Sequence, residues 1–386
     1  MCKKIKILAL TSIRAEYDLL SPLYHMLRDD NEIEFKVLVS GAHLSSRFGL
    51  TKKHIEADGL DFLAELETLI DGDSTRSKLK TASLFLQNSI DIVASYAPDV
   101  ILFAGDREDV IMGGMLGTFL KIPTIHFYGG DHETGGHEDT VIRHATSKLA
   151  TYHFVCHKEH KRRLQAIGES EDRISIIGSI ALDKFQNFEA SSKSEVASKL
   201  SISPYERCAL VIYHPSPSSS EDDSIVFDSI LSELAQRNIF SFVSFPNTDG
   251  NNSKIISVIE KYQGDSKFYF FRNLERQLFL SIFSQCDFLI GNSSAGIYEA
   301  ASIPVAAINV GRRQTDRMCN DNVLFCGTET NDIAKAIEKV GSQEFSQIVA
   351  QQSNIFGLGD SADRALHLIK TLSLSEKVVK NEDPLL

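Results

Sequence analysis

Short apolar runs alternate with longer helical patterns along the whole chain, and this alternation is the feature that most constrains the fold. In the first half, five runs are nearly continuous in apolar residues, as is typical of strands covered on both faces. These predicted strands are residues 4–10, 34–39, 100–104, 124–127 and 152–156. Helical patterns separate them, at residues 17–27, 77–96, 108–120 and 158–167. This order predicts a parallel sheet with right-handed crossovers.

The second half repeats the same order of elements. The predicted strands there are residues 209–213, 240–245, 268–271, 287–290 and 305–309, with helices between them such as 224–236 and 274–284. A chain of 386 residues also exceeds the size of roughly 250 to 300 residues at which single cores stop growing. We therefore predict an α/β protein with two Rossmann-like domains.

We place the domain boundary in residues 174–179, so that residues 1–175 form the first domain and 176–360 the second. A last helix within residues 361–386 is expected to return to the first domain, and the polar tail from Ser375 is expected to fray. Doubly wound sheets bind ligands at the carboxyl ends of their strands. The active site is therefore expected in the cleft between the domains.

Composition excludes several classes of protein. The formal net charge of −12 argues against binding to nucleic acid or to an anionic membrane surface, since both need a basic field. No stretch approaches the roughly 18 apolar residues that span a bilayer. The six cysteines are widely spread without a CxxC pair, which favours reduced thiols and a cytoplasmic location.

Small and hydroxyl residues follow one strand of the second half, in the segment Gly291-Asn292-Ser293-Ser294. Gly291 permits a tight turn, and the following helix start presents N–H groups to an anion, so a diphosphate would fit there. The alternative is that Asn292 or Ser293 merely caps a helix. Glu299, one turn further, could accept hydrogen bonds from ribose hydroxyls, or be a solvated surface glutamate.

Arginines also follow predicted strand ends. Arg14 opens the loop after the first strand, and Arg313 and Arg317 follow the strand 305–309. In an acidic protein, guanidinium groups in such places are candidates to bind phosphate oxygens. Ordinary surface arginines are the alternative, which we favour for Arg312.

Three carboxylates follow neighbouring strands of the first half. Asp106 and Asp131 come directly after strands, and Asp139 follows shortly, before Arg143. Carboxylates that converge on one sugar ring could serve as acid and base, because closeness and burial raise a carboxyl pKa. Equally, Asp106 and Asp139 could cap the following helices. His214, at a strand end of the second half, could face the same site.

Motifs for metals and common cofactors are missing. The cluster His126, His132, His137 and His144 has no HExxH or Cys/His spacing, so zinc is not expected. Neither GxGxxG after the first strand nor GxxxxGK[ST] occurs, which argues against a nicotinamide-dependent dehydrogenase and a P-loop enzyme.

Taken in order, these motifs resemble the hydrolysing UDP-N-acetylglucosamine 2-epimerases, especially the branch of sialic-acid and legionaminic-acid synthesis. The resemblance runs from the first strand to the last helix. Its motifs are Arg14-Ala15-Glu16-Tyr17, Gly41-Ala42-His43, Gly105-Asp106-Arg107, Gly129-Gly130-Asp131, Ile142-Arg143-His144, His214-Pro215, Gly291-Asn292-Ser293-Ser294, Arg313-Gln314 with Arg317, and Gly359-Asp360.

The resemblance implies a glycosyltransferase-B-like fold, no metal and no cofactor, and a homodimer. It places the diphosphate on Ser293 and Ser294, the ribose on Glu299, and further nucleotide oxygens on Arg14 and Arg313. It also implies a set of catalytic residues with a supporting arginine: Asp106, Asp131, Asp139 and His214, with Arg143.

Two positions depart from the family pattern. The family usually has Gly-Gly-Glu where this chain has Gly130-Asp131, and its sialic-acid branch has two adjacent acids where this chain has Asp139-Thr140. The shorter Asp131 side chain draws the carboxylate back by roughly 1.5 Å. Glu133 or Glu138 could supply a missing acid.

The implied reaction converts UDP-N-acetylglucosamine and water to N-acetylmannosamine and UDP through a glycal, as the first step of sialic-acid-type synthesis. Three alternatives remain open. One is the same reaction on UDP-2,4-diacetamido-2,4,6-trideoxyglucose, the second is a retaining glycosyltransferase, and the third is a sugar-nucleotide sensor without turnover.

Overall fold

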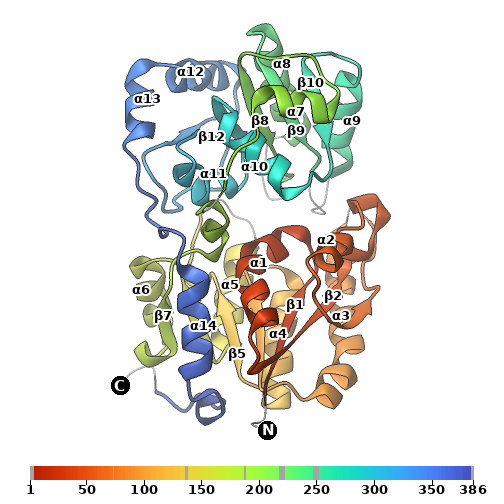
Figure 1. Cartoon of the computed structure of the whole chain (residues 1–386), viewed down its shortest axis with the longest axis vertical. Helices are drawn as coiled ribbons and strands as arrows, with labels where there is room; N and C mark the ends of the chain where they lie inside the picture. Colours follow the sequence, from red (N-terminus) through yellow and green to blue (C-terminus); the bar gives the residue numbers. More distant parts are fainter. Residues whose placement is uncertain are drawn as a thin grey trace. The chain divides into compact units, whose positions relative to one another are not determined.

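The chain forms two compact units, each built on its own parallel sheet (Figure 1). The computed structural model describes residues 4–72, 74–134, 138–186, 188–216, 222–246 and 252–383. Unit 1 comprises Met1–His132, Glu138–Lys184 and Phe356–Leu386, and unit 2 comprises Glu133–His137 and Phe185–Ile355.

The sheet of unit 1 has the strand order β3-β2-β1-β4-β5-β6-β7, with every neighbouring pair parallel. Its strands are β1 (Ile5–Thr11), β2 (Ile33–Ser40), β3 (Phe62–Leu66), β4 (Val100–Ala104), β5 (Thr124–Phe127), β6 (Tyr152–Val155) and β7 (Ile174–Ile176). The central strands β4, β5 and β6 are buried along their whole length, because helices cover both faces of the sheet.

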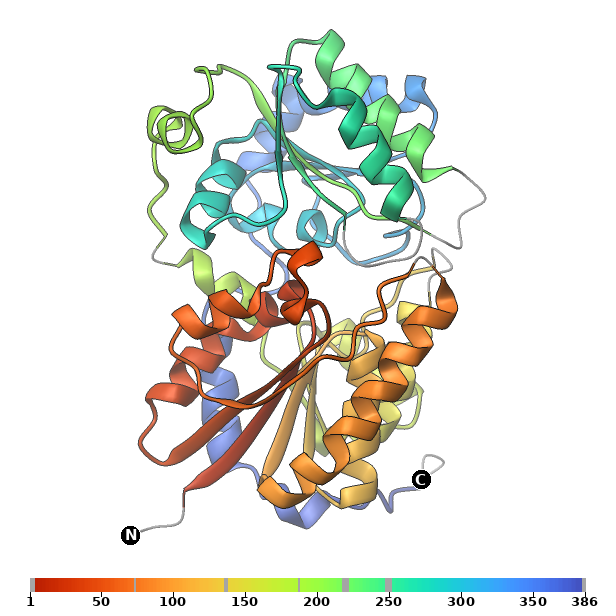
Figure 2. The same ribbon diagram turned by 90° about the vertical axis from the view of Figure 1, so that its right-hand side faces the viewer.

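The α-helices of unit 1 are α1 (Arg14–Asp29), α2 (Lys52–Ala57), α3 (Thr75–Tyr96), α4 (Glu108–Leu120), α5 (Asp139–Leu149), α6 (Lys158–Ala166) and α14 (Ser361–Thr371). Helices α3, α4 and α5 pack side by side, and α14 packs against α1; Figure 2 shows the long α3 in orange beside the sheet. Glycines let α4 lie close to the strands. A Cβ at Gly117 would be 2.1 Å from a Thr124 methyl carbon, so a larger residue there would push the helix away.

Unit 2 repeats the design with the strand order β10-β9-β8-β11-β12-β13, again parallel throughout. Its strands are β8 (Cys208–Ile212), β9 (Phe240–Ser244), β10 (Phe268–Phe271), β11 (Phe288–Gly291), β12 (Ala306–Val310) and β13 (Val323–Cys326). Its α-helices are α7 (Lys193–Leu200), α8 (Asp223–Gln236), α9 (Asn252–Tyr262), α10 (Arg276–Gln285), α11 (Ala295–Tyr298), α12 (Thr330–Val340) and α13 (Gln343–Ala350). One apolar cluster fills each face of this sheet.

Short 3₁₀ helices complete the two units. They are η1 (Gly41–Leu44), η2 (Ser46–Phe48), η3 (Glu171–Arg173), η4 (Ile180–Phe185), η5 (Ala300–Ser302) and η6 (Leu374–Lys377).

No helix within the described ranges is long and apolar enough to cross a membrane.

The predicted fold class is confirmed in its two Rossmann-like, parallel α/β domains. The position of the division differs from the prediction. Residues 174–176 form β7 and pair with β6, so this edge strand stays in unit 1 and the units divide between Lys184 and Phe185. The predicted last helix is α14, which ends at Thr371 and returns to unit 1 as expected.

The prediction that the tail frays from Ser375 is wrong for residues 375–382, because this segment is tied to unit 1 by backbone and side-chain hydrogen bonds. Arg173 donates to the carbonyl oxygens of Lys377 (2.7 Å) and Val379 (3.3 Å). Lys380 Nζ donates to the carbonyl oxygens of Ser147 (3.0 Å) and Lys148 (3.1 Å). We call residues 373–382 the C-terminal strap.

Candidate active site

The topology gives each unit one place where a ligand is expected. In unit 1 the chain winds outward in both directions from the neighbouring strands β1 and β4, and in unit 2 from β8 and β11. Ligands of doubly wound sheets bind at the carboxyl ends of such strand pairs. Several residues that the sequence analysis singled out follow these four strands, including Asp106, His214 and Asn292.

Gly291 ends β11 at a point where no larger residue fits. A Cβ there would lie 2.0 Å from the carbonyl oxygen of Ile212, and the φ of Gly291 is +146°. The close approach lets the Asn292 N–H donate to that same carbonyl (3.1 Å). The loops after β8 and β11 are thereby held against each other.

Asn292 organises the loops of unit 2. Its side chain is buried and makes two bonds to the backbone of His214: Oδ1 accepts from the N–H (2.7 Å) and Nδ2 donates to the carbonyl (2.8 Å). Its own carbonyl accepts from Arg313 Nη1 (3.2 Å) and Gln314 Nε2 (2.9 Å). Three loops, after β8, β11 and β12, therefore meet at Asn292.

The remaining predicted residues of unit 2 lie on the same loops. Ser293 Oγ accepts from the Ala295 N–H (3.3 Å), and Ser294 precedes α11. Glu299 follows α11, which is a single helical turn, and is half-buried. Arg317 Nη1 donates to Gln314 Oε1 (2.5 Å), and its guanidinium lies 5.8 Å from the centre of the Tyr298 ring.

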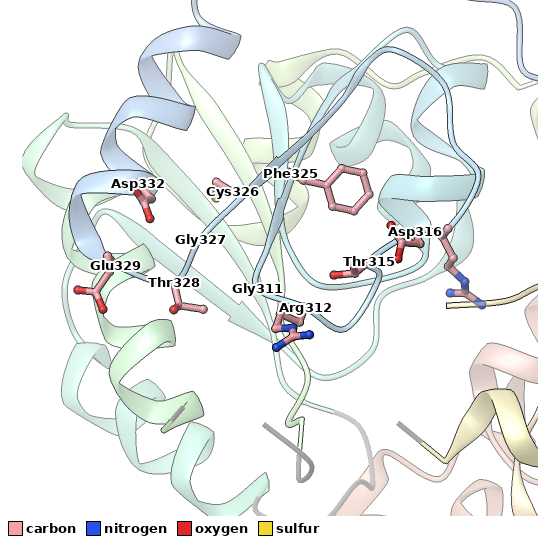
Figure 3. Close-up of a pocket in the computed structure, with 11 residues that line it drawn as sticks. Gly311, Arg312, Thr315, Asp316, Phe325, Cys326, Gly327, Thr328, Glu329 and Asp332 are labelled. Carbon is pink, nitrogen blue, oxygen red and sulfur yellow. The ribbon is translucent and has the colours of Figure 1, made fainter. Parts of the chain in front are cut away.

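An open pocket of about 770 Å³ lies beside the loop after β12. Figure 3 shows Glu329 and Asp332, at the beginning of α12, across from Thr315 and Asp316 on this loop. Arg312, which the sequence suggested to be an ordinary surface residue, and Arg317 also line the pocket. The loop thus contributes Arg313 and Gln314 to Asn292 and its other side chains to the pocket.

In unit 1, Arg143 joins two of the predicted carboxylate loops. Its side chain is almost fully buried on α5. Nη2 forms an ion pair with the Asp106 carboxylate, and Nη1 donates to the carbonyl oxygen of Asp131 (3.1 Å). Asp106, Asp131 and Arg143 are therefore brought together as the sequence predicted, at the carboxyl ends of β4 and β5.

Two further predicted residues, Asp139 and Arg14, each begin a helix of unit 1. Asp139 is the first residue of α5, four residues before Arg143, so the two side chains share a helix face. Arg14 is the first residue of α1, and its Nε donates to the Asp18 carboxylate (3.2 Å).

A buried acidic cluster holds the loop after β1. Glu16 Oε2 accepts from the N–H (2.9 Å) and the hydroxyl (3.1 Å) of Ser12. Burial, and next the Asp109 carboxylate, raises the pKa of Glu16 well above its usual value. Burial, and next the Glu108 carboxylate, raises the pKa of Asp109 to about 6. The Glu16 and Asp109 carboxyls therefore connect two segments. One is the loop before Arg14, and the other is the first turn of α4, which follows shortly after Asp106.

Two of the four histidines that the sequence analysis considered for a metal, His132 and His144, lie against each other. His132 Nδ1 and His144 Nε2 are 3.2 Å apart, and the rings are stacked. His126 Nε2 contacts the carbonyl oxygen of Gly105 (2.8 Å), while His137 lies outside the described residues. Across the described part of the chain, no three His, Cys, Asp or Glu side chains are grouped so that they could hold a metal ion.

The sequence analysis gave no role to three residues that shape these sites. Gln314 is buried against Asn292, Glu16 against Ser12, and His160 lies beside Asp131 with its Nε2 3.7 Å from Oδ1. Glu16 and Gln314 stood in the motifs of the resemblance without a role, and His160, within α6, stood in none of them. No pattern in one dimension reports which loops touch.

Comparison with known proteins decides the family. Residues 25–370 match the family described as UDP-N-acetylglucosamine 2-epimerase. The chain belongs to this family. It is 29% identical over 374 residues to the hydrolysing UDP-N,N'-diacetylbacillosamine 2-epimerase of Legionella pneumophila, covering 97% of this chain and 98% of that relative.

Two further members extend the comparison. The hydrolysing GDP/UDP-N,N'-diacetylbacillosamine 2-epimerase of Campylobacter jejuni is 31% identical over 347 residues, covering 89% of each chain. The UDP-GlcNAc 2-epimerase of Methanocaldococcus jannaschii, solved in complex with UDP-GlcNAc and UDP, matches with a TM-score of 0.79 at 18% identity. That match covers 95% of this chain and 99% of the other and shows the glycosyltransferase-B-like fold.

Proposed function

We propose that this protein is a hydrolysing 2-epimerase of a UDP-activated N-acetyl sugar. The observation that carries the proposal is Arg143, which is buried and bound to both the Asp106 carboxylate and the Asp131 backbone. This bridge fixes two carboxylate loops at the carboxyl ends of adjacent strands. Two carboxylates held in fixed places suit proton transfer at one carbon atom.

The proposed first substrate is UDP-2,4-diacetamido-2,4,6-trideoxyglucose. The two relatives compared above, at 29% and 31% identity, are named for UDP-N,N'-diacetylbacillosamine, a diacetamido sugar nucleotide. A relative from Neisseria meningitidis at 30% identity is named UDP-N-acetylglucosamine 2-epimerase. The second candidate is UDP-N-acetylglucosamine, which gives the family its name and which the sequence put first. It would yield N-acetylmannosamine for sialic-acid-type synthesis.

The proposed reaction begins when a base removes the proton from sugar C2 and the C1–O bond to UDP breaks, which leaves a glycal and UDP. Water then adds at C1, and an acid returns a proton to C2 on the opposite face. Asp106 and Asp131 are the proposed proton-transfer groups, with Arg143 as their support. Asp139 is proposed to position the sugar or activate the water.

Residues of unit 2 are proposed to bind the nucleotide. Ser293 and Ser294 would contact the diphosphate, Glu299 the ribose, and His214 the region of the anomeric carbon. Arg313 and Arg317, together with Arg14 of unit 1, would neutralise the charge that develops on UDP as it leaves. Gly291 and Asn292 hold the loops that carry these groups. The steps move protons, water and UDP, and no electrons pass to a cofactor.

We also propose that the protein is a cytoplasmic homodimer. Large apolar side chains are exposed on the helix layer of unit 1, namely Leu79 and Ile90 on α3 and Phe119 on α4. Large exposed apolar side chains are candidates for an interface where they gather on one surface.

Proton NMR in deuterated water tests the proposed reaction. The protein is incubated with each sugar nucleotide, and release of UDP and of a free C2-inverted sugar carrying deuterium at C2 is the expected result for one of them. The variant D106N is the control and should bind UDP without turnover. Sugar transfer only in the presence of an acceptor would instead identify a glycosyltransferase, and UDP binding without any turnover would identify a sensor.

A further inference from the structure

The first turn of α6 is pressed against the loop that carries Asp131. Gly130 has φ +75°, and a Cβ on it would lie 2.2 Å from the carbonyl oxygen of His160. Arg163, on the same helix, donates from Nη1 to the carbonyl oxygen of Gly130 (3.2 Å). Because only glycine allows this approach, the loop and the helix are fixed relative to each other within unit 1.

This packing places the His160 imidazole beside the Asp131 carboxylate. His160 has no exposed surface, and its Nε2 lies 3.7 Å from Asp131 Oδ1. Both ring nitrogens are buried without a hydrogen-bond partner among the described residues. A buried unsatisfied imidazole is costly, and 3.7 Å is beyond hydrogen-bond length. Contacts of this kind tighten when substrate binds.

The surroundings keep this imidazole neutral. Burial lowers the pKa of His160 to about 4, opposed by the Asp131 carboxylate and assisted by Arg163, Arg143 and His157. The ring packs on Phe356, with centroids 5.9 Å apart. Asp131 itself is also faced by Arg143 and by the backbone N–H of His132, which donates to Oδ1 (2.8 Å). His144, on α5, is a further charged or titratable neighbour of Asp131.

We propose that His160 is a positioning residue for proton transfer, whose neutral Nε2–H donates to Asp131 and holds this carboxylate ionised and oriented toward sugar C2. The role in catalysis rests on the proposed epimerase function, whereas the placement of His160 Nε2 3.7 Å from Asp131 Oδ1 is a property of the folded chain. The two parts are therefore tested separately.

The contact is tested without turnover by NMR of protein labelled with ¹⁵N in its histidines. His160 is assigned by comparison with the variant H160Q. In the wild type we expect a neutral ring with the proton on Nε2 between pH 5.5 and 8, and in D131N an altered Nε2 signal. A proton on Nδ1, or an unchanged signal in D131N, would overturn the proposal.

The role in catalysis is tested with the variants H160F and H160Q. The variant H160F keeps a ring that packs on Phe356 but lacks the N–H, so its kcat/KM should fall about 10- to 100-fold. The acid limb of its pH profile should move up by about one pH unit, since Asp131 loses a donor to its ionised form. Glutamine can still donate and should recover part of the loss, while UDP affinity stays unchanged in both.

The matched control is H153Q. His153 is an equally buried imidazole that faces a buried carboxylate, with Nε2 2.8 Å from Glu169 Oε2, but it lies away from the candidate site. Its loss should lower stability and leave the acid limb in place. If the acid limb of the pH profile stays in place in both H160F and H160Q, the positioning role is refuted. It is also refuted if H160Q lowers kcat/KM by the same factor in the D131N protein as in the wild type. If the wild type turns over neither sugar nucleotide, the proposed function fails while the NMR result stands.

Discussion

Arg143 links the two carboxylate loops of unit 1, through Asp106 and the backbone of Asp131. Replacing it by methionine keeps most of the volume but leaves the Asp106 carboxylate without its ion pair. We expect R143M to lower kcat by about 10²-fold, because misplaced groups lose that much, and to lower the free energy of unfolding by about 2 kcal/mol.

Initial rates of UDP release and urea unfolding curves measure these two effects. R143K is the control, since lysine keeps the charge but cannot bridge both partners at once. R143K should regain more of the lost free energy of unfolding than of the lost kcat. A value of kcat for R143M within tenfold of the wild type would show that the bridge is not needed for the reaction.

Buried neutral histidines make the stability of this protein depend on pH. Burial lowers the pKa of His126 from its usual 6.5 to about 3. As the pH falls below 6.5, the unfolded chain binds a proton at this residue that the folded chain does not, so stability is lost on acidification. Between pH 7.5 and pH 5 this residue alone should cost about 2 kcal/mol.

The variant H126Q, which cannot titrate, isolates this contribution. Its unfolding free energy should fall by about 2 kcal/mol less than that of the wild type over the same pH interval. The buried carboxyls with raised pKa values, such as Asp183 at about 6, act in the opposite direction but are present in both proteins. Equal pH slopes for the two proteins would contradict the assignment.

At the scale of elements, the C-terminal strap is the feature whose removal has the clearest expected effect. The strap supplies Lys380 to the buried Glu169 carboxylate (2.5 Å), and its backbone carbonyls and Glu382 to the buried Arg173. A chain truncated after Leu372 leaves both side chains without these partners. We expect its unfolding free energy to fall by at least about 3 kcal/mol.

The strap contacts the amino-terminal end of β6, Arg173 just before β7, and the end of α5, opposite the candidate site. Values of kcat at 25 °C should therefore stay within about threefold. K377A is the matched control, because Lys377 pairs with the exposed Asp172, and such pairs contribute less than about 1 kcal/mol. If the truncated chain has the same free energy of unfolding as the wild type, the contacts of the strap do not stabilise the protein.

Elements differed in how well the sequence predicted them. The strands β4 and β5 begin and end where their apolar patterns predicted, because burial on both faces leaves a continuous run of apolar residues. The helix α4 and the aromatic edge strand β10 also have the predicted bounds, although β10 is only partly buried. The strands β3, β7 and β13 were missed. They are short strands at sheet edges and are only partly buried, so their sequences carry a weak signal.

In the candidate site, the residues that follow strands could be predicted from the sequence, whereas their packing partners could not. Parallel strands end at one edge, so the residues after them could be named from the sequence, including Asp106, Asp131 and His214. The partners that fix them could not, because Gln314 beside Asn292 and His160 beside Asp131 depend on how loops and helices pack.

At the scale of the whole molecule, the proposed homodimer gives a last prediction. Phe119 on α4 is 78% exposed and Leu79 on the adjoining α3 is 71% exposed. Burying such groups against a second copy removes apolar surface from water, at roughly 25 cal/mol per Å². Light scattering of the wild type should therefore give twice the chain mass of 42.9 kDa.

The variant F119E places a charge in that surface and should reduce the mass to that of one chain. I225E is the control, since Ile225 is similarly exposed, on α8 of unit 2, and its mass should remain that of the dimer. Phe119 lies at the end of α4 away from Asp106, so the F119E monomer should keep the affinity for UDP. A wild type that sediments as a single chain, or an F119E variant that stays dimeric, would place the exposed apolar side chains of α3 and α4 outside any interface between copies.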